Sequence, residues 1–257
     1  RFNVSRNWNR FRKSYSGRDF QEKVIGKPLS GIYLFKDLGM IESDADVPYV
    51  FDQSGKKQML SPEGDEEYFF TKGMRRIADI NGDGQLTDDD LVYAGTTLPQ
   101  AYGGLVNEVR WKNFDVNVLL TYTLGRKMVN SFKYSTLQGR LGVYPVFSNV
   151  SLSDFWQSAS DGSKYQTLGL YGNSTLININ GQYDARTDDN IETVNFLRLK
   201  QLTIGYNLPK RIMKKLWLDG IRIFVTGEDL FLLSNYSGLD PEVTNIGTGF
   251  DDGRTYP

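Results

Sequence analysis

The sequence predicts an all-β protein whose strands form part of a large antiparallel transmembrane β-barrel. Three observations support this fold class. One segment alternates apolar and polar residues over the length of a membrane-crossing strand, short connections contrast with very long polar ones, and aromatic residues make up 13% of the 257 residues. These aromatics are mostly Tyr and Phe, which favour pleated, half-buried surfaces over helical bundles.

The first predicted strand pair lies within residues 102–124. Between residues 114 and 124, apolar and polar side chains alternate, with Leu119 as the one exception. The polar members are Asp115, Asn117, Thr121 and Thr123. A strand of about ten residues is long for a small soluble sheet and matches one that crosses a membrane at a tilt. A tight turn near Asn113 is expected to join it to the preceding strand.

A second strand pair is predicted near the C-terminus. The alternation that begins at Leu197 shifts by one residue, which indicates a β-bulge near Lys200–Gln201. Pro209 ends this strand, and a basic stretch at residues 210–215 separates it from another alternating segment at residues 221–226. No helix longer than two or three turns is expected in this region.

Two polar segments are far longer than ordinary connections between strands. They cover residues 42–76 and about 130–192, and the second is interpreted as a long external loop. Short turns at one end of a sheet and long loops at the other are typical of outer-membrane barrels. A soluble β-sandwich would show more even spacing, so the barrel is the favoured interpretation.

Composition excludes several classes of function. The chain has no Cys and no His, which removes disulfides, zinc–thiolate sites, histidine general bases and the Ser–His–Asp triad. Its formal net charge of −1 predicts no general attraction to nucleic acid. Asp240, Glu242, Asp251 and Asp252 form an acidic segment, but catalysis by paired carboxylates would require a suitable separation, and no enzymatic activity is expected.

Residues 79–90 match the twelve-residue calcium-binding loop of EF-hand proteins. The expected ligands are Asp79, Asn81, Asp83, the backbone carbonyl of Gln85, Thr87 and Asp90. Gly84 occupies the sharp turn, and Leu86 is expected to point inward. Because the last position is Asp rather than Glu, its shorter side chain reaches a cation less easily, so Ca²⁺ is predicted with Mg²⁺ as the alternative. The competing interpretation is a turn that its own Asn and Asp side chains stabilise without an ion.

An aromatic group in the long polar segment is a candidate ligand-binding surface. It consists of Trp156, Tyr165, Tyr171 and Tyr183, with Asn173, Asn178 and Asn180 nearby in the sequence. Rings and amides of this kind stack on and hydrogen-bond to sugars. The alternative is that these side chains fold the loop on itself or contact a partner protein.

Several sequence blocks follow one another along the chain in a recognisable order. They are residues 25–29 (IGKPL), 79–90 (DINGDGQLTDDD), Gly95, Pro99, 103–105 (GGL), 196–209 (FLRLKQLTIGYNLP), 228–231 (EDLF) and 236–243 (YSGLDPEV). Together they cover essentially the whole chain. In this order they resemble the C-terminal half of SusC/RagA-type TonB-linked outer-membrane proteins.

The resemblance implies a 22-stranded barrel in the outer membrane of a Gram-negative, Bacteroidetes-type cell, plugged by an N-terminal domain. It also implies TonB-driven import of an oligosaccharide or peptide beneath a SusD-like surface lipoprotein. Residues 1–257 would be the C-terminal segment of this barrel, without the plug domain, the TonB box and the closing strand. Phe114, Val116, Val118, Leu120 and Tyr122 would then face outer-membrane lipid, and the polar members of that strand would line the lumen.

Two other interpretations remain open. A secreted, calcium-stabilised β-sandwich that binds carbohydrate would explain residues 79–90 and the aromatics, but not the ordered sequence blocks. A carboxylate-based glycosidase is the third.

Overall fold

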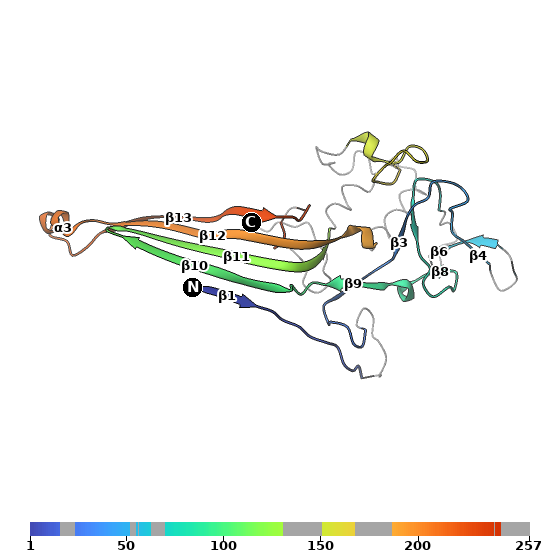
Figure 1. Cartoon of the computed structure of the whole chain (residues 1–257), viewed down its shortest axis with the longest axis horizontal. Coiled ribbons are helices and arrows are strands. Elements are labelled where there is room, and N and C mark those ends of the chain that lie inside the picture. The colour runs from blue at the N-terminus through green and yellow to red at the C-terminus, as the bar shows by residue number, and fades with distance from the viewer. Residues whose placement is uncertain are drawn as a thin grey trace.

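The computed structural model describes residues 1–15, 24–51, 55, 57–62, 70–130, 151–167, 187–238 and 240–242. Its largest element is a five-stranded antiparallel sheet with the strand order β1-β10-β11-β12-β13 (Figure 1). The strands are β1 (Phe2–Ser5), β10 (Ala101–Trp111), β11 (Phe114–Val129), β12 (Ile191–Asn207) and β13 (Arg222–Ser234). The all-β prediction is therefore confirmed for the part of the chain that the structure describes.

Short connections join the strands at one end of the sheet, which we call the turn end. β10 and β11 are joined by Lys112 and Asn113 alone, and Trp111 pairs with Phe114 across the turn. Lys112 has a φ of 53°, the left-handed conformation that two-residue hairpin turns use. The predicted tight turn near Asn113 is confirmed. β12 and β13 are joined through the helix α3 (Lys210–Leu216), which occupies the predicted basic stretch.

The bulge predicted near Lys200–Gln201 is also confirmed. Leu120 pairs with Leu199 and Leu119 pairs with Gln201, so the register between β11 and β12 skips Lys200. The register between β12 and β13 shifts at the same place, between Leu199 and Gln201. The bulge explains why the apolar alternation changes phase there.

The opposite end of the sheet carries a group of short strands that we call the cap, comprising the described residues of 24–97, 151–167 and 187–190 (Figure 1). Its strand pairs are β2 (Gly31–Leu34) with β9 (Val92–Thr96), β3 (Asp37–Met40) with β7 (Arg75–Ile77), β4 (Tyr49–Phe51) with β5 (Lys57–Met59), and β6 (Ser61–Pro62) with β8 (Gln85–Leu86). Three single-turn 3-10 helices complete it: η1 (Asp88–Asp90), η2 (Leu152–Asp154) and η4 (Asp188–Asn190).

The cap has a hydrophobic core of its own. Its buried side chains are Phe35, Ile41, Val47, Leu60, Phe70, Met74, Ile77 and Leu86. Two smaller clusters lie where the cap meets the strands, one around Met128, Val194, Phe196 and Tyr236, the other around Ile32, Leu34 and Val129. The predicted inward position of Leu86 is confirmed.

The two long polar segments differ in content. Residues 42–76 contain β4, β5, β6 and the start of β7, so the described residues of this segment are part of the cap. The expected external loop at about 130–192 corresponds to the connection between Val129 and Ile191, which pair with each other at its two ends. Of that connection the structure describes 130, 151–167 and 187–190. Across the described parts of the chain, no helix is both long and apolar enough to span a membrane.

Candidate functional site

The register of the sheet separates an apolar face from a polar one. One row across all five strands contains Phe2, Leu105, Leu120, Leu199 and Phe231. Another row on the same face contains Val109, Val116, Ile204 and Val225. The residues predicted to face lipid on β11 all lie on this face, because successive side chains of a strand point to opposite sides.

The polar face carries hydrophilic side chains of the kind that suit a water-filled lumen. A row of it contains Glu108, Asn117, Thr203 and Thr226, and the last two share a hydrogen bond of 3.0 Å between their hydroxyl groups. At the turn end, Arg222 of β13 pairs with Asp115 of β11 across β12.

A cluster of charged side chains lies on the polar face near the middle of β12. The Arg198 side chain is only 9% exposed, and its guanidinium group lies 2.6 Å from the Asp240 carboxylate and 3.3 Å from that of Glu242. Lys200, at the bulge, lies 3.0 Å from Asp229 and 3.1 Å from Glu242. Asp240 and Glu242, which follow β13 in the sequence, therefore lie over the sheet, and their carboxylates compensate a nearly buried Arg.

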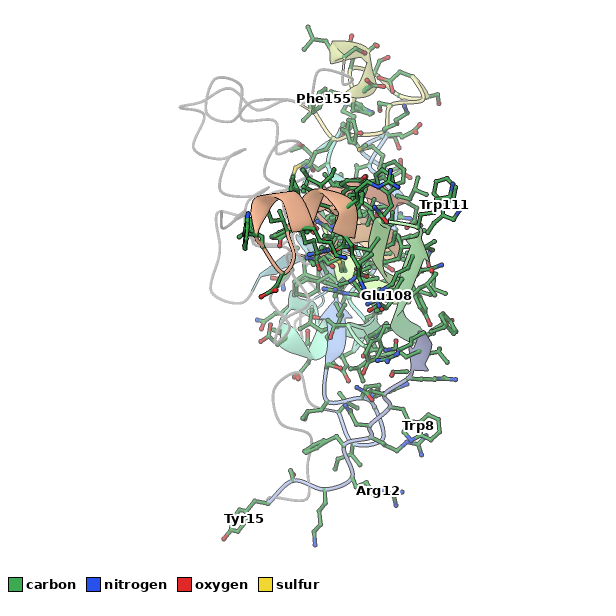
Figure 2. All side chains as sticks on the ribbon, turned by 90° about the vertical axis from the view of Figure 1, so that its left-hand side faces the viewer. Trp8, Arg12, Tyr15, Glu108, Trp111 and Phe155 are labelled. Atoms are coloured by element: carbon green, nitrogen blue, oxygen red, sulfur yellow. The ribbon has the colours of Figure 1, made fainter. Side chains whose placement is uncertain are left out.

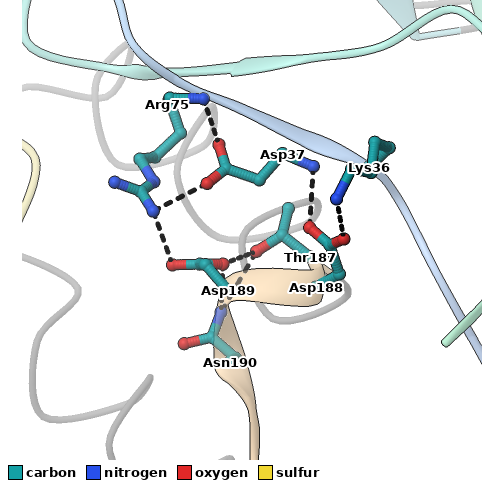
Figure 3. A network of polar contacts seen from close by, with 8 residues as sticks. Lys36, Asp37, Arg75, Thr187, Asp188, Asp189 and Asn190 are labelled. Atoms are coloured by element: carbon teal, nitrogen blue, oxygen red, sulfur yellow. Dashed lines mark hydrogen bonds and ion pairs between the residues drawn. The ribbon is translucent and has the colours of Figure 1, made fainter. Parts of the chain in front are cut away.

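A second polar network lies within the cap and joins β3 and β7 to η4, which leads directly into β12 (Figure 3). The Arg75 guanidinium group lies 2.7 Å from the Asp37 carboxylate and 3.2 Å from that of Asp189. Asp188 accepts hydrogen bonds from the Lys36 ammonium group at 2.6 Å and from the Asp37 backbone N–H at 2.9 Å. We call Lys36, Asp37, Arg75, Asp188 and Asp189 the clip. Burial raises the pKa of the Asp37 carboxyl group, and the nearby Arg75 opposes that shift.

The structure brings the predicted metal loop together as a compact turn. Asp79 accepts hydrogen bonds from the backbone N–H groups of Gly82 and Gly84 at 2.6 and 2.9 Å. Asp90 is fully buried and accepts from the N–H groups of Ile80, Asn81 and Thr87, at 2.8, 3.3 and 2.9 Å. These two carboxylates close the loop from its two ends.

The remaining predicted ligands complete the turn. Asn81 donates to the Asp83 carboxylate at 2.9 Å, and Asp83 in turn accepts from the Gln85 backbone N–H at 2.8 Å. Among the described residues, no group of three or more acidic side chains is arranged to hold a metal ion. The donor chemistry suits a hard cation, since it consists of carboxylate, amide and hydroxyl oxygens, but the carboxylates bind backbone N–H groups instead of converging on one point.

The aromatic group is only partly within the described residues, because Tyr171 and Tyr183 lie outside them. Trp156 and Tyr165 are half-buried and hold the segment 151–167 together: the Trp156 backbone N–H donates to the Tyr165 carbonyl at 2.9 Å. The indole of Trp156 lies directly over Gly73, where a Cβ atom would meet the ring at 2.4 Å. The contacts described for these two residues are internal to the cap, and sugar binding by them stays a prediction.

Sequence reasoning missed the charged cluster and the clip. Arg198 and Lys200 stand out in the sequence as cations alternating with leucines, which is a signal for a polar face. Their carboxylate partners Asp240 and Glu242 come from beyond the next strand, and nothing local indicates that pairing. The clip joins Arg75 to Asp189, separated by 114 positions.

Comparison with curated proteins identifies relatives of one kind. No family model matches the sequence. The chain is 27% identical to "TonB-dependent receptor P3" and 29% identical to "TonB-dependent receptor P26", both of Formosa agariphila, each over 72% of this chain and 18% of the relative. It is also 27% identical to "TonB-dependent receptor SusC" of Bacteroides thetaiotaomicron, over 65% of this chain and 15% of the relative. The chain thus spans about a fifth of the length of the curated relatives it matches.

Solved structures with the same fold include chains of the RagAB system. A chain of the RagAB peptide transporter matches 97% of this chain with 24% of its own length, at a TM-score of 0.61 and 19% identity. A chain of the RagAB peptide importer in its closed-closed state matches 87% of this chain, at a TM-score of 0.55 and 21% identity. This likeness shows the fold, a segment of a large antiparallel barrel.

The relatives and neighbours are receptors and transporters, which agrees with the expectation that this chain is not an enzyme. Proteins of this type are located in the outer membrane. The comparisons therefore confirm the SusC/RagA resemblance: this chain is similar to one part of the barrel of a TonB-dependent outer-membrane receptor.

Proposed function

We propose that this chain forms part of the wall and the external cap of an importer for oligosaccharides or peptides, driven by TonB and assisted by a SusD-like lipoprotein. The observation that carries the proposal is the two-faced sheet. An apolar face suits lipid, and a polar face with a compensated charge cluster suits a water-filled lumen. The names of the relatives support TonB dependence, and the RagAB neighbours support a peptide as one of the two cargo classes.

The dimensions of the apolar face support a membrane-spanning wall. On β11 it runs from Phe114 to Leu124. At about 3.3 Å per residue and a tilt of roughly 40°, this length rises roughly 25 Å, the height of the apolar band of outer-membrane barrels. In such barrels the short turns face the periplasm and the long loops face outward, so the cap is the external end.

Import is tested with the full-length protein in its host. A deletion strain is complemented with the wild-type gene. Uptake of labelled peptides and of labelled oligosaccharides is then measured in the deletion strain and the complemented strain, with and without functional TonB. We expect one cargo class to accumulate only when both the receptor and TonB are present. If the strain that lacks the receptor takes up both cargo classes as well as the strain with the wild type does, the proposal is contradicted.

The partner is tested separately. Affinity purification of the full-length receptor from detergent-solubilised membranes should co-purify a surface lipoprotein in a fixed ratio. A receptor that transports cargo but purifies alone would remove the lipoprotein from the proposal and leave import intact.

We also propose that residues 79–90 bind Ca²⁺, with Mg²⁺ as the alternative. The spacing of the oxygen ligands supports this, and each carboxylate oxygen that accepts one N–H retains a second lone pair. Cation binding would require the hydrogen bond between the Asn81 amide and the Asp83 carboxylate to break, so that the oxygens of both side chains can contact the cation.

Calorimetric titration of Ca²⁺ into the full-length receptor tests the ion. Asp79→Asn and Asp83→Asn should abolish the binding isotherm, whereas Asp89→Asn, an exposed neighbour outside the ligand positions, should retain it. If the wild type takes up no Ca²⁺ or Mg²⁺ at millimolar concentration, the turn is closed by its own side chains alone.

A further inference from the structure

The segment that follows β1 keeps the two-sided pattern of a strand, although it has left the sheet. On one side, the Asn7 side chain donates to the Tyr102 hydroxyl group at 3.0 Å, and the Asn9 side chain accepts from the Leu29 N–H at 2.8 Å. Phe11 is half-buried, and its backbone exchanges hydrogen bonds with Lys27 and Gly26, at 2.9 and 2.7 Å. These odd-numbered positions fasten the segment to the protein.

The even-numbered positions carry a row of cations with one indole. They are Arg6, Trp8, Arg10 and Arg12, all of them exposed, and Trp8 is 81% exposed. The Arg6 guanidinium carbon lies 5.7 Å from the centre of the Trp8 ring, a cation–π distance. Within the described part of the chain, no carboxylate forms an ion pair with any of the three arginines.

This row continues the apolar face of the sheet. In β1 the even-numbered residues Phe2 and Val4 pair with Leu105 and Gly103 on that face. Because side chains alternate along an extended chain, the even-numbered positions beyond Val4 lie on the same side. Figure 2 agrees, since Trp8 and Trp111 project to the same side of the molecule.

The position of the row relative to the apolar face of the sheet is also defined. β1 runs toward the cap, since Phe2 pairs with Leu105 and Ser5 with Tyr102, next to the start of β10 on the cap side. Arg6 is therefore placed at the upper edge of the apolar face, on the external side. This is the level at which the headgroups of the outer leaflet meet an outer-membrane barrel, and Trp is enriched at that interface.

A hollow lies beside the row, and three of the row's four members contribute to its lining. It has a volume of about 510 Å³ and is lined by Trp8, Asn9, Arg10 and Arg12. Guanidinium groups bind phosphate with two parallel hydrogen bonds, and an indole covers the adjoining apolar or sugar surface. The hollow therefore offers guanidinium groups for the phosphate and an indole for the sugar or apolar surface of a phosphorylated glycolipid headgroup.

We propose that Arg6, Trp8, Arg10 and Arg12 form a binding site for the phosphate-bearing headgroup of an outer-leaflet glycolipid, which anchors this edge of the cap to the membrane surface. The proposal rests on the barrel and its location, and not on the identity of the cargo. An acidic surface of a partner protein is the competing occupant, but the continuity with the lipid-contacting face favours lipid.

The test measures binding of lipopolysaccharide to the purified full-length receptor by native mass spectrometry. Two lipid preparations are compared, one intact and one chemically dephosphorylated. We expect the intact lipid to bind at least tenfold more tightly. The variant Arg6→Gln/Arg10→Gln/Arg12→Gln should lose roughly 100-fold in affinity, given three cations near an anionic lipid surface. Trp8→Ala should lose less.

A matched control removes three cations from the opposite end of the protein. Lys210→Gln/Arg211→Gln/Lys214→Gln alters exposed residues of α3, at the turn end, and should change lipid affinity less than twofold. Heat-modified migration of each variant in gels reports whether the barrel has folded. A salt titration of the wild type provides a second measurement, because phosphate contacts weaken as ionic strength rises.

Three outcomes would overturn the proposal. They are equal binding of intact and dephosphorylated lipid, unchanged lipid binding by the folded triple Arg variant, and displacement of the lipid by inorganic phosphate at an equal phosphate concentration, which would assign a free-anion site. Loss of the lipoprotein partner from the Arg variant with full retention of lipid would assign the row to a protein contact.

Discussion

In the cap, large apolar side chains lie inside, whereas over much of the five-stranded sheet they lie on the surface. Phe35 is 0% exposed and Phe70 is 2% exposed, while Trp111 and Val225 are 63% and 73% exposed. Both regions are built from β-strands of one chain. The difference indicates two solvents: the cap buries apolar surface away from water, and the sheet presents it to lipid.

The largest expected effect comes from opening the cap core. Phe35→Ala should destabilise the cap by about 3–5 kcal/mol, because it removes a fully buried ring and leaves a cavity. Hydrogen exchange of the full-length receptor would show faster exchange in cap amides and unchanged exchange in β10 and β11. The control is Phe51→Ala, an exposed residue of the same region, which should have little effect. Equal exchange in the two variants would contradict the assignment of the core.

Introducing a charge into the sheet, instead of removing an apolar side chain, distinguishes its two faces. Val118→Arg places a charge on the apolar face and should cost about 2–4 kcal/mol near the middle of the membrane, whereas Asn117→Arg on the polar face should cost little. An outer-membrane assembly assay compares the folded fraction of the two variants. Equal tolerance would mean that the apolar face does not contact lipid.

The charged cluster of the polar face should contribute less. Arg198→Gln should destabilise the fold by about 1–3 kcal/mol, because it leaves nearby carboxylates without their nearly buried partner. Arg222→Gln is the matched control: its side chain is 42% exposed, so loss of its pair with Asp115 should cost under about 1 kcal/mol. A double-mutant cycle of Arg198→Gln with Asp240→Asn measures the coupling, and additive effects would show that the pair is not formed.

The clip should produce the smallest effect, visible as a dependence on pH. Burial raises the pKa of Asp37, so the folded cap binds a proton at a higher pH than the unfolded chain does. The contribution of Asp37 to cap stability therefore increases as pH falls through its raised pKa, and decreases as pH rises through it. Asp37→Asn should remove this part of the pH dependence of cap hydrogen exchange, corrected for the intrinsic exchange rate. An unchanged profile, or a slope of opposite sign, would show that another group titrates.

The wall was more predictable from sequence than the cap because its pattern is local. The alternation along β11 assigns each side chain to a face, and the phase slip at Lys200 marks the bulge without reference to any partner strand. The beginning of β12 was less visible, since Thr193 and Asn195 weaken the apolar pattern there.

The features that sequence did not reveal depend on contacts between distant segments. The clip requires β3, β7 and η4 to meet, and the Arg198 cluster requires Asp240 and Glu242, which follow β13 in the sequence, to lie over β12. In the predicted metal loop, spacing correctly indicated a compact turn with Gly84 and an inward Leu86. Spacing could not indicate that Asp90 would be buried and bonded to three backbone N–H groups.

β1 and β10 are direct neighbours in the sheet, although about a hundred residues separate them. For the wall, residues 6–100 are therefore one insertion between two adjacent strands, residues 130–190 are a second one, and the cap is built from both. The entropy of closing such an insertion grows only with the logarithm of its length. The cap can consequently be lengthened or shortened while the strand register remains the same, so that the cap and the wall can change independently of each other.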